Sequence, residues 1–142
     1  MKSWRATFIA SACLLAGVSV SYAQPASPQA QVAALPAPYN AANYDAGQRA
    51  FAQCADCHAI EAGVAKLGPN LHGVIGRRAG AAPGYEYTQA LSNAGFNWDA
   101  AHLDAWLKDP AGYLPGNEML ADGVTDDAQR RDLIAYLMIA SR

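Results

Sequence analysis

The sequence has little charge, no basic cluster and few cysteines. Only 15% of its 142 residues are charged, and ten basic residues face twelve acidic ones. Without a basic cluster the chain has no electrostatic attraction to phosphates, which argues against nucleic-acid binding. Hydrophobic residues make up 52% of the chain, so it is not a disordered acidic tail. Its length fits one ordinary domain rather than two.

The sequence also lacks an apolar run of the roughly 20 residues that a membrane-spanning helix needs. A shorter uncharged run over 8–20 follows Lys2 and Arg5 and precedes Ser21-Tyr22-Ala23. This arrangement predicts a signal peptide over residues 1–23, with an uncleaved N-terminal anchor as the alternative. Cleavage would leave eight basic and twelve acidic residues, a net charge of −4. We expect an exported, soluble periplasmic protein.

Residues 24–42 contain four prolines with alanine and glutamine, and no charge. This composition predicts an extended linker rather than packed structure. One domain of about 100 residues, 43–142, remains.

β-Branched residues are scarce in this domain, since only seven of residues 43–142 are valine or isoleucine and no stretch alternates. We therefore expect an all-α fold. Three main helices are predicted: 43–54 with Asn43 as its cap, 99–107 with Asp99 as its cap, and a terminal helix with Thr125 as its cap. Long Gly- and Pro-rich stretches over 59–84 and 109–124 suggest loops that surround a large group other than polypeptide.

One motif carries specific chemistry. Cys54, Cys57 and His58 form a Cys-x-x-Cys-His sequence, the pattern of covalent c-type haem attachment. Thiols three residues apart at a helix end can each bond a haem vinyl group, and the adjacent histidine can bind the iron. The third cysteine, Cys13, falls in the predicted signal peptide.

Three other interpretations of the cysteine pair fit less well. A thioredoxin-like redox pair needs a preceding strand and a βαβ unit. A structural zinc site needs four ligands, whereas only the separated His72 and His102 remain. A disulfide between Cys54 and Cys57 would close a very short loop and so restrict the unfolded chain little.

A second iron ligand would distinguish an electron carrier from a haem that is open to oxygen or peroxide. The candidates are His72, His102, Met119 and Met138. Met138 is expected in the core of the terminal helix, and His102 in solvent. Met119 follows a Pro-Gly turn that can direct a thioether to the far face of a haem. The residue pattern alone leaves this choice open.

Six motifs in order carry a family resemblance: the haem motif, 68–73, 84–88, Trp98, 113–119 and 132–137. Over 44–142 the chain resembles the class I cytochrome c family, in its mitochondrial and bacterial c2-like branch. The resemblance implies a single cytochrome c domain in which three main helices and long loops surround one haem c, attached through two thioethers.

The resemblance also implies roles for individual residues. Met119 would be the second axial ligand opposite His58, and the Pro69 carbonyl would accept a hydrogen bond from the His58 imidazole. Further expected haem contacts are Leu71, Arg77, Tyr87, Trp98 and Trp106, of which Arg77, Tyr87 and Trp98 would bind a propionate. Gly47 and Phe51 would form the crossing of the first helix with the last, against Leu133 and Tyr136.

The chain departs from the family pattern at several positions. Trp106 replaces a tyrosine that contacts the methionine sulfur in many relatives, Leu91 replaces an asparagine, and Ala121 replaces an aromatic residue at the haem edge. The lysine ring of mitochondrial relatives is missing. Only Lys66 and Lys108 remain in the domain, so attraction to an acidic partner does not carry over.

The expected function is single-electron transfer in the periplasm by a monomer that docks transiently with redox proteins, without enzymatic activity, nucleic-acid binding or stable membrane insertion. Two alternatives stay open. The chain would be a dedicated subunit of a dehydrogenase, tethered by 24–42, or a peroxidase or gas sensor in which Met119 dissociates from the iron.

Overall fold

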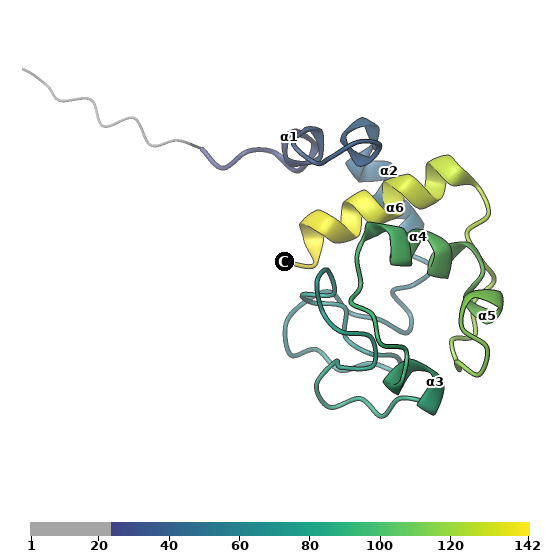
Figure 1. The fold of residues 1–142 in the computed structure, drawn as a ribbon. Helices are drawn as coiled ribbons and strands as arrows, with labels where there is room; N and C mark the ends of the chain where they lie inside the picture. Colours follow the sequence, from purple (N-terminus) through teal and green to yellow (C-terminus); the bar gives the residue numbers. More distant parts are fainter. Residues whose placement is uncertain (1–23) are drawn as a thin grey trace, which may run out of the picture.

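The computed structural model describes residues 24–142 (Figure 1). The signal peptide predicted for residues 1–23 lies outside the described residues. The helices are α1 (Pro28–Ala33), the 3-10 helix η1 (Tyr39–Ala41), α2 (Tyr44–Phe51), α3 (Gln89–Ser92), α4 (Ala100–Lys108), α5 (Pro110–Tyr113) and α6 (Asp127–Ala140). Within 24–142, β structure is limited to one isolated bridge between Arg78 and Asn97. The predicted all-α fold is confirmed.

Two of the three predicted helix caps are present. The Asn43 side chain accepts a hydrogen bond from the Ala46 amide at the start of α2, and Asp99 accepts one from the His102 amide at the start of α4. Helix α2 ends at Phe51 rather than at Cys54, because the chain continues in tighter turns through the cysteine motif.

The predicted cap of the last helix is wrong by one residue. Asp126, not Thr125, caps α6, and its carboxylate accepts a hydrogen bond from the Gln129 amide at 2.7 Å. A carboxylate at this position also interacts favourably with the positive end of the helix dipole, which a neutral threonine hydroxyl does not.

Helices α2 and α6 cross in close contact (Figure 1). The crossing point is Gly47, where a Cβ atom would lie 2.1 Å from the carbonyl oxygen of Asp132 and 2.7 Å from the Cβ of Tyr136. The ring of Phe51 packs against that of Tyr136 with centroids 5.5 Å apart. The predicted crossing is therefore confirmed.

The predicted extended linker is wrong for residues 28–42. Helix α1 and η1 pack against the domain, and Val32 is completely buried in a small core with Ala42, Ala135 and Ile139. Ser27 caps α1, which has proline in its first turn. These are helix-start signals that the overall composition of the segment obscured.

Polar contacts also hold this N-terminal arm. The side-chain amide of Gln29 donates to the Ala42 carbonyl at 2.9 Å and accepts from the Tyr44 amide at 2.8 Å. The Tyr39 hydroxyl donates to the carbonyl of Ala100 at 3.3 Å. The arm is thus docked onto its own domain rather than free to act as an extended tether.

Replacing Val32 with alanine should therefore destabilise the protein. Removing two buried methyl groups from a closed apolar cluster costs about 1–2 kcal/mol of unfolding free energy. Val64 is 41% exposed, and Val64→Ala is a matched control that should change stability by less than about 0.5 kcal/mol. Denaturant unfolding of both variants measures the difference; equal losses would mean that the arm is not packed.

The remaining chain forms the lower half of the molecule, where long loops and the short helix α3 lie below α2, α4 and α6 (Figure 1). The loops close a space against the helices' inner faces, where Leu103, Trp106 and Leu133 are buried. Within residues 24–142, no helix is both long and apolar enough to cross a membrane.

Candidate functional site

A pocket of about 410 Å³ lies between the helices and the loops. It falls in the size range of small-molecule and cofactor sites, about 300–1,000 Å³. The pocket brings together all ten residues that the sequence singled out as cofactor contacts: Cys54, Cys57, His58, Pro69, Leu71, Arg77, Tyr87, Trp98, Trp106 and Met119.

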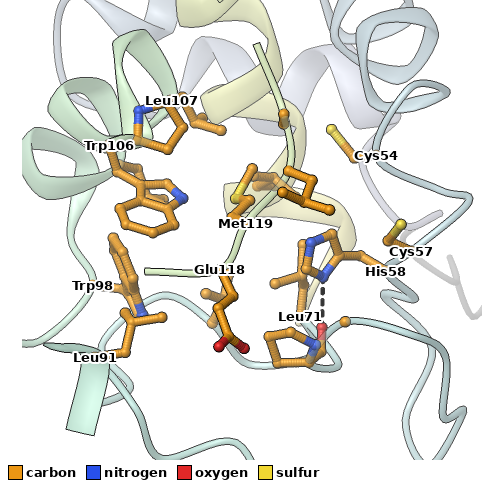
Figure 2. Close-up of a pocket in the computed structure, with 18 of the residues that line it drawn as sticks. Cys54, Cys57, His58, Leu71, Leu91, Trp98, Trp106, Leu107, Glu118 and Met119 are labelled. Atoms are coloured by element: carbon orange, nitrogen blue, oxygen red, sulfur yellow. Dashed lines mark hydrogen bonds between the residues drawn. The ribbon is translucent and has the colours of Figure 1, made fainter. Parts of the chain in front are cut away.

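The two cysteines lie on the turns that follow α2, with the His58 amide bonded to the Cys54 carbonyl at 2.9 Å. Both are half-buried free thiols on the wall of the pocket, on the same side as His58 (Figure 2). Burial, with a contribution from neighbouring Cys57, raises the pKa of the Cys54 thiol to about 11. Two accessible thiols facing one cavity suit covalent attachment of a group held there.

His58 is oriented by a single hydrogen bond, at 2.8 Å, between its Nδ1 and the Pro69 carbonyl (Figure 2). A carbonyl only accepts, so Nδ1 carries the proton and donates. In the neutral imidazole, Nε2 then holds a lone pair that can bind a metal ion. A Cβ on Gly68 would lie 2.6 Å from the imidazole Cε1, so the absence of a side chain there allows the ring its position.

Met119 reaches the pocket from a loop that Asn117 fixes. The Asn117 side chain donates to the carbonyls of Pro110 and Leu114 at 2.8 and 2.9 Å, and accepts from the Met119 amide at 2.9 Å. Asn117 was not among the predicted site residues, although an asparagine two residues before the ligand candidate is a signal for such a turn.

The other three candidate ligands lie elsewhere. His72 is exposed, and His102 stacks on Phe96 with ring centroids 4.4 Å apart while bonding Asp99. Met138 is a partly buried residue of α6 that does not line the pocket. Of the four candidates, Met119 alone shares the pocket with His58.

The wall opposite the cysteines is largely apolar (Figure 2). Trp98 and Trp106 are buried and meet edge to face with centroids 5.4 Å apart. Leu91 and Leu107 complete this side of the pocket. Such a wall excludes water and suits a large flat aromatic group.

The pocket also contains unpartnered polar groups. Arg77 donates to the carbonyls of His72 and Asn70, each at 2.9 Å, but its Nε is buried without a partner. The Thr88 hydroxyl is likewise buried without a partner, although Thr88 stands at the N-cap position of α3. Thr88 ends the 84–88 motif but was not among the predicted site residues, and a lone threonine in a loop gives no local signal of such a role.

Burial perturbs the ionisable groups beside these atoms. It lowers the pKa of Arg77, an effect that nearby Tyr87 partly offsets, and it raises the pKa of Tyr87. The buried Nε of Arg77 and the buried Thr88 hydroxyl are costly unless an anionic or polar group in the pocket accepts from them.

This donor set fits a c-type haem and not the alternatives. Both cysteines are free thiols, so they form no disulfide. Within 24–142, no three His, Cys, Asp or Glu residues cluster as a zinc site requires, and the strand of a thioredoxin-like motif is missing from the same residues. The pocket offers two thiols for the vinyl groups of a haem, and an imidazole with a free Nε2 and a thioether for its iron. The unpartnered donors suit its propionates.

Comparison with known proteins gives a consistent result. A family model described as cytochrome c matches residues 44–141. The chain is 40% identical to cytochrome c2 of Rhodoplanes tepidamans over 94 residues, which cover 66% of this chain and 88% of that protein. It is 40% identical to cytochrome c type-1 of Ascaris suum over 96 residues, which cover 67% and 86%. The structure of cytochrome cH from Methylobacterium extorquens matches with a TM-score of 0.64 and 42% identity, covering 68% of this chain and 97% of that one.

Proposed function

This chain belongs to the cytochrome c family, and we propose that it carries single electrons between redox proteins in the periplasm. A member of this family is a haem c electron carrier rather than an enzyme. In this proposal, His58 and Met119 would hold the haem iron. One observation carries the proposal: the pocket combines the two attachment thiols with an imidazole and a thioether from separate segments.

A haem held in this pocket would supply the redox chemistry, which is the uptake and release of one electron. The chain's contribution is to fix the two ligands and exclude water. The Pro69 carbonyl accepts a hydrogen bond from Nδ1–H of His58 and so holds the ring, and the Asn117 side chain accepts from the Met119 amide and so fixes that backbone. Thioether ligation and an apolar surrounding both favour the ferrous state and raise the potential.

Arg77, Tyr87, Trp98 and Thr88 form the proposed propionate site. The buried Nε of Arg77 and the Thr88 hydroxyl lack partners within the protein, which supports an acceptor supplied by the cofactor. Charged acceptors form the stronger hydrogen bonds, so a propionate would stabilise these donors, and the donors would favour its ionised form.

The Thr88→Val variant tests this site. If Thr88 donates to a propionate, its loss should lower the unfolding free energy of the haem-loaded protein by about 1–2 kcal/mol. Thr125 is exposed and does not line the pocket, so Thr125→Val is a control with a change below about 0.5 kcal/mol. If Thr88 had no acceptor, removing its buried hydroxyl would leave the stability unchanged or raise it.

Periplasmic location and a monomeric state are parts of the same proposal. The charged start, apolar run and small residues of 1–23 support export. The experiment combines cell fractionation, gel filtration and a spectroscopic redox titration of the native protein. A red monomer from the periplasm that titrates reversibly with one electron per chain would agree. Constant co-elution with a larger dehydrogenase would instead indicate a dedicated subunit.

A further inference from the structure

Arg130 of α6 is a buried cation that joins two helices. Its side chain is 4% exposed, and its Nε donates to the Asp104 carboxylate of α4 at 2.7 Å. One of its terminal nitrogens, Nη2, donates to the Asp127 carboxylate at the start of α6, also at 2.7 Å. A buried charge is costly unless it is paired and hydrogen-bonded. These two carboxylates already supply that pairing.

The third nitrogen of Arg130 contacts the loop that carries Met119. This loop, residues 114–126, joins α5 to α6, and we call it the Met119 loop. Nη1 donates to the Val124 carbonyl at 2.8 Å and to the Thr125 carbonyl at 3.3 Å. Bonds from an ionised donor are about twice as strong as those between neutral groups. Arg130 therefore holds the C-terminal end of the Met119 loop against α6.

Helix α4 holds the same end of the loop through its backbone. The Val124 amide donates to the Leu107 carbonyl at 2.7 Å. A Cβ atom on Gly123 would lie 1.9 Å from the Lys108 carbonyl oxygen, so the loop backbone is in direct contact with the end of the helix. Helices α4 and α6 are themselves in contact (Figure 1), and Arg130 bridges them where the loop meets both.

The part of the loop between its two fixed ends has few bonds of its own. The Met119 amide donates to the Asn117 side chain, which fixes the N-terminal end. In the described part of the chain, Glu118 and residues 120–123 form no hydrogen bond. The position of the Met119 thioether therefore depends on Asn117 before it and on the contacts of Val124 after it.

We propose that Arg130 is a positioning residue for the axial thioether: it holds the C-terminal end of the Met119 loop between α4 and α6, and so limits how often Met119 leaves the haem iron. This inference rests on the proposed function and adds a residue that does not line the haem pocket. A guanidinium suits the role because its planar fork binds carboxylates on two sides and the loop carbonyls at the same time.

The Arg130→Lys variant keeps the charge but loses the fork, because an ammonium is one nitrogen that cannot reach both carboxylates and both carbonyls. Arg131→Lys is the matched control. It makes the same substitution one position along α6, where the side chain is 33% exposed and donates to Asp132 of its own helix. Val32→Ala is a second control, which lowers stability in a cluster that does not include the loop.

Replacement of Met119 by imidazole measures how often the thioether leaves the iron. In the oxidised, haem-loaded protein, an imidazole nitrogen bonds the ferric iron as the Met119 sulfur departs, and no electron or proton is transferred. Loss of the near-infrared sulfur-to-iron band follows this exchange. Losing a hydrogen bond from a charged donor corresponds to about a tenfold change in an equilibrium constant. Arg130→Lys should therefore bind imidazole about tenfold more tightly, and each control should change the affinity by about twofold or less.

Hydrogen exchange of the Val124 amide is a second measurement, because this amide bonds Leu107 only while the end of the loop is in place. Native-state exchange reports local opening of this kind. In Arg130→Lys the Val124 amide should exchange about tenfold faster, and by a larger factor than the amide of Ile134 in the buried middle of α6. Equal acceleration of both amides would mean that Arg130 stabilises the whole domain and has no particular role at the loop.

Asp104→Asn tests the same proposal if Arg130→Lys does not fold. It leaves Arg130 in place and removes the charge that orients Nε. Since the Asp104 side chain is 44% exposed, the expected gain in imidazole affinity is smaller, about two- to threefold. Asp45→Asn removes an exposed charge in the first turn of α2 and should give no gain. Equal affinities of these two variants would contradict the role of Arg130.

The remaining outcomes separate this proposal from the proposed function. Imidazole binding by Arg130→Lys that is no tighter than by Arg131→Lys or Val32→Ala would overturn the positioning role, and so would faster Val124 exchange without tighter imidazole binding. An oxidised wild-type protein that lacks the near-infrared band would instead overturn Met119 as an iron ligand, and with it the proposed function.

Discussion

Replacing Met119 with alanine should remove the weak near-infrared sulfur-to-iron charge-transfer band of the oxidised protein and lower its midpoint potential. The axial ligand is the main control that a protein has over haem potential, across a span of about 0.8 V, so a decrease on the order of 0.2 V is expected. Met119 shares its pocket with His58, and without its thioether the ferrous state loses the ligand that favours it.

Met138 provides the matched control. It is also a methionine but lies in α6 outside the pocket, packed against the core. Met138→Ala should cost some stability while keeping the near-infrared band and the potential. Spectra and potentiometric titrations of the two variants give the comparison. If Met138→Ala lost the band, or if Met119→Ala kept it, Met119 would not be the iron ligand.

The Gly47→Ala variant is expected to lose about 3 kcal/mol or more of unfolding free energy. The added Cβ would overlap the Asp132 carbonyl at 2.1 Å and approach the Tyr136 Cβ at 2.7 Å. The first contact is to backbone, which no rotamer change can relieve, so α2 and α6 must separate. Asn43 would be disturbed as well, because its amide donates to the Asp132 carboxylate at 3.1 Å.

Gln48 is the neighbouring residue on the exposed face of α2, and Gln48→Ala should change stability by no more than about 0.5 kcal/mol. Denaturant unfolding, followed by the helical circular dichroism signal, measures both variants. If Gly47→Ala prevents folding altogether, unfolding cannot be measured. The yield of haem-loaded protein is therefore compared as well. A Gly47→Ala protein as stable as Gln48→Ala would contradict the close crossing.

The attachment motif and the starts of α2 and α4 were predictable because their signals are local. Cys54, Cys57 and His58 are nearly contiguous, and Asn43 and Asp99 each cap the helix that follows them directly. Recognising Met119 from the residues alone was not possible. The choice between it and three other candidates depends on which side chains the loops bring into one cavity.

Two features were missed because tertiary contacts decide them. Residues 24–42 have the composition of a linker, yet Val32 is buried against Ala135 and Ile139 from the opposite end of the chain, a partner that no local pattern reveals. Thr88 looks like a helix cap, but its hydroxyl makes no capping bond and lies buried in the pocket. The shape of the pocket is what distinguishes a helix cap from a donor that faces the cavity.

The central claim is that one haem is fastened through Cys54 and Cys57. Intact-protein mass spectrometry under denaturing conditions tests it most directly, using protein exported from cells with working cytochrome-maturation machinery. We predict the mass of the chain from Gln24 onward plus one haem, which stays attached after unfolding because the bonds are covalent. A mass equal to the polypeptide alone would contradict the account.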